Sequence, residues 1–197
     1  MELSTKSDDL LIGVVGGGAM GQGIVQVSLE GGMKVVLFDA KTGGGSEAKD
    51  AIFGRLERNV EKGRLEKNVL ENIKQNLVLA TDLSEFKKCD VVIEAVFEDI
   101  DVKLEVFKEV EKWVAPNCVI ASNTSSLPIA SLGRYCQHQN RFAGLHFFNP
   151  VPLMRLVEVI KGPSTEDWVI EGLTNLGKRM GRTPVVVRDA PGFLVNT

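Results

Sequence analysis

The feature that most constrains this chain is a glycine turn at residues 16–21, placed between an apolar run and a helical pattern. Residues 10–16 (LLIGVVG) are apolar on both faces, which is typical of a buried parallel strand. A helical pattern then continues to Gly31, and residues 34–38 (KVVLF) form a second apolar run. Strand, turn, helix and strand within about 30 residues predict a right-handed βαβ unit.

The turn has the spacing G-x-G-x-x-G, with glycine at positions 16, 18 and 21. The first glycine permits a tight turn, the second lets a pyrophosphate approach bare backbone, and the third lets the helix pack closely on the sheet. The helix N-terminus adds free N–H groups and the positive end of a dipole. Because this spacing joins a strand to a helix, it predicts a dinucleotide site formed by Gly16, Gly18, Met20 and Gly21.

An acidic residue, Asp39, ends the second strand about 20 residues after the turn. Its carboxylate can accept hydrogen bonds from a pair of ribose hydroxyls, and its negative charge would repel a 2′-phosphate. The sequence therefore favours NAD over NADP as the ligand, although the positive charge of the nearby Lys41 acts against this preference.

Further apolar runs continue the alternation of strands and helices along the chain. We expect strands at 77–80, 91–96, 119–122, 142–147, 155–160 and 184–188, and helices at 99–114 and around 169–180. Residues 46–75 instead carry two helical stripes separated by Gly63, which predict a helical hairpin entered through a flexible loop at 42–46. The expected fold class is α/β: a Rossmann-type doubly wound, mostly parallel sheet with a helical-hairpin insertion after the second strand.

Composition excludes several other classes of protein. The chain has 197 residues, of which 44% are hydrophobic and 25% charged, and its net charge is -3. A mildly acidic chain does not suit nucleic-acid binding, and no apolar run is long enough to span a membrane. The cysteines and histidines show no metal-ligand spacing, so we expect no metal site. Reduced cysteines and a polar N-terminus favour the cytoplasm, or the mitochondrial matrix if a presequence was removed.

Polar side chains follow three of the predicted strands, at the edge where a doubly wound sheet binds its ligand. They are Glu98, the run from Asn123 to Ser126, and the run from His146 to Asn149. His146 has a potential partner in Glu158, a carboxylate within an apolar strand that needs a partner if it is buried. A histidine oriented by a carboxylate can take a proton from an alcohol, but a satisfied core histidine explains the pattern equally well.

Five segments of the chain resemble the L-3-hydroxyacyl-CoA dehydrogenases, a family that includes 3-hydroxybutyryl-CoA dehydrogenase. They occur in the family's order and cover nearly the whole chain: GVVGGGAMGQGIVQV, IEAVFEDIDVK, ASNTSSL, GLHFFNPVPLMRLVEVI and DAPGFLVN. The resemblance implies an oxidoreductase of fatty acid metabolism (beta-oxidation), which uses NAD to convert L-3-hydroxyacyl-CoA reversibly into 3-oxoacyl-CoA.

The resemblance also implies roles for single residues. The family's catalytic histidine falls on His146, which abstracts the 3-hydroxyl proton as hydride leaves C3 for the nicotinamide, and its paired glutamate falls on Glu158. Ser125 matches a serine near the substrate oxygen and the nicotinamide, and Asn196 matches an asparagine on the substrate carbonyl side. The positions implied on the cofactor side are Glu98, Lys103, Asn123, Ser125 and Asn149.

In the resembled family, a helical insertion helps to hold the anionic coenzyme A, which implies an acyl-CoA thioester as the partner. Arg55 and Lys62 fall nearest the family's contact positions, although the family more usually has serine at the place of Arg55. Each of these side chains could equally belong to a solvated charged face. The family continues into a helical C-terminal domain that makes the main dimer contact. We therefore expect residues 1–197 to be the NAD-binding domain of a longer homodimeric enzyme. By itself this domain should keep NAD binding better than turnover.

Two other functions remain open at the level of sequence. One is a dinucleotide-binding module without turnover, against which the joint presence of His146, Glu158, Ser125 and Asn149 argues. The other is a dehydrogenase acting on a small β-hydroxyacid rather than on a thioester. Such enzymes use a lysine in place of the histidine–glutamate pair, so the HFFNP segment and the basic insertion argue against this alternative.

Overall fold

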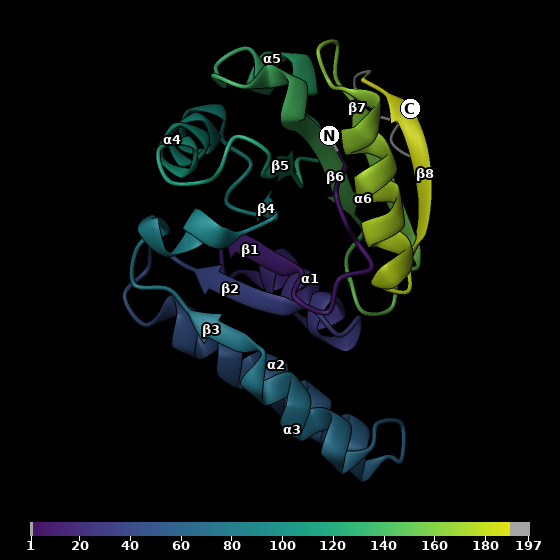
Figure 1. The fold of residues 1–197 in the computed structure, drawn as a ribbon. Coiled ribbons are helices and arrows are strands. Elements are labelled where there is room, and N and C mark those ends of the chain that lie inside the picture. Colours follow the sequence, from purple (N-terminus) through teal and green to yellow (C-terminus); the bar gives the residue numbers. More distant parts are fainter. Residues whose placement is uncertain (1, 190–197) are drawn as a thin grey trace.

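One mixed sheet of eight strands runs through the computed structural model, which describes residues 2–189 (Figure 1). The strand order is β3-β2-β1-β4-β5-β6-β7-β8. Strands β1 to β6 are parallel, β7 is antiparallel to β6, and β8 is parallel to β7. The strands are β1 (Leu11–Val15), β2 (Lys34–Phe38), β3 (Leu77–Leu79), β4 (Val91–Glu94), β5 (Val119–Ser122), β6 (Phe142–Phe147), β7 (Leu156–Lys161) and β8 (Thr183–Arg188). The predicted doubly wound, mostly parallel sheet is confirmed.

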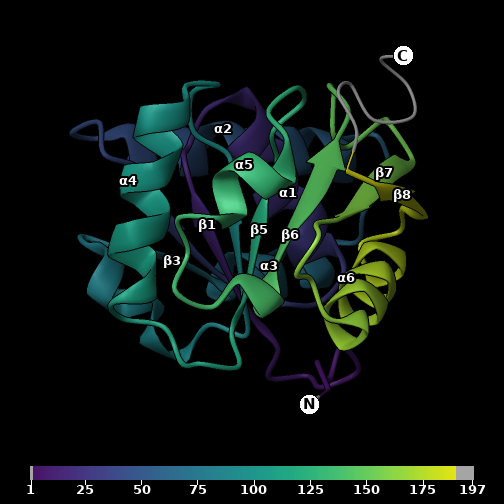
Figure 2. The ribbon, with the colours of Figure 1, turned by 90° about the horizontal axis from the view of Figure 1, so that it is seen from above.

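Helices cover both faces of this sheet, because successive strand residues point to opposite sides. On one face, buried side chains pack on α1 (Ala19–Glu30), α2 (Gly44–Glu61), α3 (Lys67–Gln75) and α6 (Asp167–Arg179). On the other face, they pack on α4 (Ile100–Glu111), α5 (Ile129–Gly133) and a 3-10 helix at Leu83–Lys88; a second short 3-10 helix spans Gln139–Arg141. Figure 2 shows α4 and α5 on the near side of the strands, with α1 and α2 behind them.

The insertion after β2 is a pair of neighbouring helices, α2 and α3, which extend away from the sheet near β3 (Figure 1). The prediction of a flexible entry loop at 42–46 is wrong in its second half, because α2 begins at Gly44. Gly43 has φ +78°, a left-handed conformation that suits glycine, and a side chain at Gly44 would collide with the carboxylate of Asp39. The glycine run therefore brings the helix close to the end of β2.

The bounds of the remaining helices and strands agree with those predicted from the sequence to within a few residues. Strands β5 and β6 have the predicted bounds, whereas β4 stops at Glu94, whose side chain accepts the N–H of Val96. The helix predicted at 99–114 ends at Glu111, ahead of Pro116, and Trp113 beyond its end is exposed. Helix α5 and the 3-10 helices were not expected, since they are too short to show a periodic pattern.

Candidate functional site

The glycine turn lies between the end of β1 and the start of α1, and its three glycines have different surroundings. Gly16 has φ +107°, and a Cβ there would lie 2.6 Å from the carbonyl oxygen of Ala95. A Cβ at Gly21 would collide with the carbonyl oxygen of Gly16. A Cβ at Gly18 would meet no protein atom within 4 Å. Gly18 is the N-cap residue of α1, so no side chain caps the first N–H groups of this helix. The turn therefore leaves open backbone at Gly18, where a dinucleotide pyrophosphate fits.

Asp39 lies directly against this turn, at the end of β2. Its Oδ2 accepts a hydrogen bond from the N–H of Gly17 (2.5 Å), and its Oδ1 accepts one from the N–H of Lys41 (2.8 Å). The Lys41 ammonium lies against both oxygens of Glu47 at 2.7 and 2.9 Å, and these contacts raise the pKa of Lys41. The positive charge that the sequence placed near Asp39 is thus paired with another carboxylate.

A cleft of about 710 Å³ opens at the carboxyl ends of the central strands. It brings together all three polar clusters that the sequence placed after β4, β5 and β6. Its lining consists of Met20, Ala95, Val96, Glu98, Lys103, Asn123, Ser125, Ser126, His146, Phe147, Phe148 and Asn149. The position at the strand ends, beside the glycine turn, is where doubly wound sheets bind their ligands.

His146 and Glu158 form a buried pair on neighbouring strands. They are register partners in the antiparallel pairing of β6 with β7, and His146 Nδ1 lies 2.7 Å from Glu158 Oε2. The two residues are 5% and 1% exposed, and the ring of Phe148 packs on the imidazole at 4.5 Å between centroids. A carboxylate at Nδ1 fixes the tautomer and the orientation of the ring, which is how a histidine that exchanges a proton with a ligand is held.

Glu98, which lines the same cleft, is the centre of a hydrogen-bond network. Its Oε1 accepts bonds from the Thr124 hydroxyl (2.5 Å) and from the N–H groups of Ser125 (2.9 Å) and Ser126 (3.2 Å). Partial burial acts to raise the pKa of Glu98. The Thr124 hydrogen bond, the charge of Lys103 and the Ser125 N–H outweigh burial and lower that pKa to about 2. The carboxylate is therefore charged throughout the neutral range and fixes the loop that carries Ser125.

Lys103 lies beneath Glu98 and is only 1% exposed. Its ammonium bridges Glu98 (3.2 Å) and the fully buried Glu94 (2.7 Å), which also accepts a hydrogen bond from the Ser122 hydroxyl (2.6 Å). Lys103 thus lines the cleft while holding two carboxylates. Sequence reasoning missed Glu94 and Ser122, although Glu94 gives the same signal as Glu158: a carboxylate inside an apolar strand needs a partner.

Two asparagines complete this part of the site. The side-chain oxygen of Asn123 accepts the N–H of Phe147 at 2.9 Å, which joins the end of β5 to the end of β6 beside His146. Asn149 lines the cleft and also a second pocket of about 370 Å³. Asn196, the remaining residue predicted for catalysis, lies outside the described residues.

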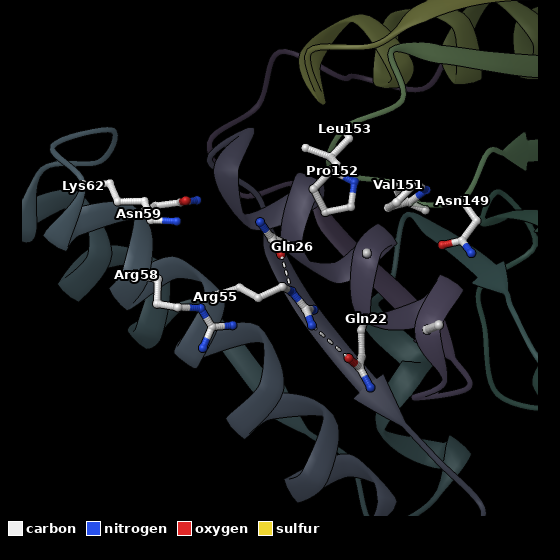
Figure 3. A pocket seen from close by; sticks show the side chains of 13 residues that line it. Gln22, Gln26, Arg55, Arg58, Asn59, Lys62, Asn149, Val151, Pro152 and Leu153 are labelled. Carbon is white, nitrogen blue, oxygen red and sulfur yellow. Dashed lines mark hydrogen bonds between the residues drawn. The ribbon is translucent and has the colours of Figure 1, made fainter.

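The second pocket lies between α1, α2 and the loop at 149–153 (Figure 3). Both residues predicted to contact coenzyme A, Arg55 and Lys62, line it, together with Arg58 and Asn59. Figure 3 shows Arg55 reaching from α2 toward α1, with Gln22 and Gln26 on either side of its guanidinium. Three cationic side chains and no acidic one line the pocket, counted over residues 2–189, which suits an anionic ligand.

Comparison with known proteins places this site in a family. The family profile described as "3-hydroxyacyl-CoA dehydrogenase, NAD binding domain" matches residues 11–190. Human mitochondrial hydroxyacyl-coenzyme A dehydrogenase is 43% identical over 190 residues, covering 93% of this chain and 60% of the human protein. A probable 3-hydroxybutyryl-CoA dehydrogenase of Deinococcus radiodurans is 40% identical over 184 residues, covering 93% of this chain and 66% of that protein.

Solved structures agree with these sequence relatives. The crystal structure of (S)-3-hydroxybutyryl-CoA dehydrogenase from Ralstonia eutropha superposes with a TM-score of 0.91 at 36% identity, covering 94% of this chain and 65% of that one. The chain thus spans about two thirds or less of the length of these relatives. Taken with the glycine turn and the cleft, these matches show that the chain belongs to the NAD-binding domain family of the 3-hydroxyacyl-CoA dehydrogenases.

Proposed function

We propose that this chain forms the cofactor half of an NAD-dependent dehydrogenase that oxidises L-3-hydroxyacyl-CoA reversibly to 3-oxoacyl-CoA. The observation that carries the proposal is the buried His146–Glu158 pair, whose histidine lines the same cleft as Met20 of the glycine turn. A general base for an alcohol proton and a site for a hydride acceptor are the two parts that such a reaction requires.

His146 acts as the general base in this proposal. Its Nδ1 is engaged by Glu158, so the other ring nitrogen, Nε2, takes the proton of the substrate 3-hydroxyl. A bound NAD would supply the acceptor for the hydride of C3, and the carbonyl would form as the carbon–hydrogen and oxygen–hydrogen bonds break. Glu158 stabilises the imidazolium that results, and it also holds the ring in one orientation through the reaction. In the reverse direction His146 returns the proton.

Residues around the glycine turn hold NAD. Gly18 leaves room for the pyrophosphate at the start of α1, and Asp39 is placed to accept ribose hydroxyls. Glu98, Asn149, Met20 and Asn123 line the cleft that would receive the nicotinamide half. Lys103 acts mainly through Glu98, since its ammonium bridges Glu94 and Glu98 and is buried beneath them. Ser125 is held by Glu98 at the mouth of the cleft, where a substrate oxygen meets the nicotinamide.

The anionic end of the acyl-CoA thioester binds in the second pocket. Arg55 and Lys62 line that pocket, and Asn149 is shared between it and the cleft. A thioester whose coenzyme A end lies on α2 can therefore extend past Asn149 toward His146. The role of Asn196 on the substrate carbonyl stays a prediction.

The test is NADH oxidation by the intact protein, followed with acetoacetyl-CoA and, in parallel, with free acetoacetate. The proposal predicts turnover with the thioester and at least about 100-fold less with the free acid, because only the thioester reaches the basic pocket. Equal turnover with both would indicate a small β-hydroxyacid dehydrogenase. NADH binding without turnover of either compound would indicate a binding module.

We also propose an oligomeric state and a cellular compartment for the intact protein. The family resemblance suggests a homodimer formed through a further helical domain, and light scattering of the intact protein measures this directly. All three cysteines are buried and unbonded, which suits a reducing compartment such as the cytoplasm or the mitochondrial matrix. Residues 2–189 contain no helix with the length and apolar character that a membrane crossing requires.

A further inference from the structure

Arg55 is held by two side-chain amides of α1. Its Nε donates to Gln26 Oε1 at 3.0 Å, and its Nη1 donates to Gln22 Oε1 at 3.2 Å. The two glutamines are four residues apart and so share one face of α1. A guanidinium can only donate, so both amides must present their oxygens to it, and their NH₂ groups point elsewhere.

Those NH₂ groups have partners of their own. Gln22 Nε2 donates to the carbonyl oxygen of Gly17 at 3.0 Å, and Gln26 Nε2 donates to Glu30 at 3.2 Å. The N–H of Gly17 in turn donates to Asp39. A continuous chain of hydrogen bonds therefore runs from the end of β2, through the glycine turn and Gln22, to Arg55 on α2. Figure 3 shows its last link, from Gln22 to Arg55.

The hydrogen-bond partners of Arg55 are neutral amides, so they do not neutralise its positive charge. No carboxylate of the described residues lies within ion-pair distance of Arg55. Burial and the neighbouring charge of Arg58 lower the pKa of Arg55. A cation that serves only to join two helices is usually paired with Asp or Glu. Here the guanidinium is oriented while its charge stays available at a pocket wall.

We propose that Gln22 and Gln26 are positioning residues that orient Arg55 as a phosphate-binding, specificity-determining residue of the second pocket, and that Gln22 fastens it to the dinucleotide turn. This inference rests on the proposed binding of coenzyme A to that pocket. The neutral amides supply orientation without neutralising Arg55, so a phosphate meets a preformed cation. The phosphate is either the 3′-phosphate or the diphosphate of coenzyme A, which share this chemistry.

A double-mutant cycle on the intact protein tests the positioning role, with Kd for coenzyme A as the readout. Arg55→Met and Gln26→Met each remove one side of the interaction at similar size. We expect Arg55→Met to weaken coenzyme A binding about tenfold and Gln26→Met to weaken it about three- to fivefold. In a protein that already carries Arg55→Met, the additional effect of Gln26→Met on Kd should fall below about twofold. Gln75→Met on α3 is the matched control and should leave Kd unchanged.

NADH binding separates the two glutamines. Gln26→Met should leave Kd for NADH within twofold of wild type, whereas Gln22→Met should weaken both ligands because it also releases the Gly17 carbonyl. Binding of 3′-dephospho-coenzyme A identifies the phosphate: the effect of Arg55→Met disappears if Arg55 contacts the 3′-phosphate and persists if it contacts the diphosphate. Both of these results support the proposal.

Other results overturn it. If wild type binds coenzyme A but Gln26→Met weakens binding equally with and without Arg55, the glutamines do not act through Arg55. If Gln26→Met lowers the unfolding temperature and leaves coenzyme A binding unchanged, the contact is only a helix–helix link. If wild type binds NADH but not coenzyme A, the proposed substrate pocket itself is wrong.

Discussion

His146 and Glu158 lie opposite each other in the one antiparallel strand pair of the described sheet, and this register holds Nδ1 2.7 Å from Oε2. The two strands are stiff, well-packed elements whose neighbouring residues are buried. A base supported in this way keeps its orientation without help from a mobile loop, so the effect of removing the carboxylate should appear mainly in turnover.

Glu158→Gln tests this support. The amide preserves the size of the side chain but cannot stabilise an imidazolium, so kcat for acetoacetyl-CoA reduction should fall about 100-fold. Kd for NADH, measured by fluorescence titration, should stay within twofold, because Glu158 lies outside the turn. Glu171→Gln, an exposed carboxylate on α6, is the control. If Glu158→Gln kept the wild-type kcat, the result would contradict the proposal that Glu158 supports His146 in turnover.

The glycine turn offers a matched set of alanine variants. Gly18→Ala meets no protein atom, so its unfolding temperature should fall by no more than about 4 °C, while Kd for NADH rises at least about tenfold. Gly21→Ala collides with Gly16 and should cost about 3 kcal/mol, or roughly 6–12 °C. Calorimetry and NADH titration measure the two effects.

Gly54→Ala, in the middle of α2, controls for the general effect of replacing glycine. Its Cβ would come no closer than 3.8 Å to a neighbour, the Arg58 guanidinium, so helix propensity should stabilise the fold by up to about 1 kcal/mol. NADH binding should not change. If Gly18→Ala also bound NADH normally, the pyrophosphate would not lie at this turn.

Cofactor selectivity should depend on Asp39 rather than on Lys41. Asp39→Asn removes the charge that repels a 2′-phosphate, so the ratio of Kd for NADPH to Kd for NADH should fall about tenfold. Lys41→Gln should change that ratio by less than twofold, because Glu47 already pairs with the ammonium. A larger effect of Lys41→Gln than of Asp39→Asn, in titrations with both cofactors, would reverse this assignment.

The lowered pKa of Glu98 predicts an acid-dependent loss of stability. A carboxylate whose pKa falls from 4.5 to about 2 on folding stabilises the native state above pH 4.5, and this stabilisation disappears as the pH falls toward 2. The free energy of unfolding should therefore be higher for wild type than for Glu98→Gln at pH 7, with the gap closing between pH 4.5 and 2. Urea unfolding at several pH values measures the gap, and Glu105→Gln on α4 is the exposed control. A gap that stays constant down to pH 2 would contradict the network around Glu98.

The sequence predicted the sheet and the turn because their signals are local. Apolar runs mark the central strands, and the glycine spacing lies within a single βαβ unit. Gly44 and Gly45 were misread as part of a flexible loop because a run of glycines is typical of a loop. Gly44 instead begins α2, where a side chain would collide with the carboxylate of Asp39.

The supporting residues of the site were harder to predict, since each has its partner far along the chain. Gln26 meets Arg55 after 29 residues, and Ser122 meets Glu94 after 28. Glu94 was detectable in principle as a carboxylate within an apolar strand, but which groups satisfy it depends on how β4, β5 and α4 pack. A polar residue within an apolar strand therefore shows from the sequence that it requires a hydrogen-bond or ion-pair partner. Only the folded structure shows which residue that partner is.

The central claim is that His146 takes a proton from a substrate bound beside NAD. The most direct measurement is NADH oxidation with acetoacetyl-CoA at 340 nm for wild type and His146→Gln, together with Kd for NADH from fluorescence titration. We predict that His146→Gln lowers kcat by at least about 100-fold while Kd for NADH stays within twofold. Turnover by His146→Gln at the wild-type rate would contradict the account.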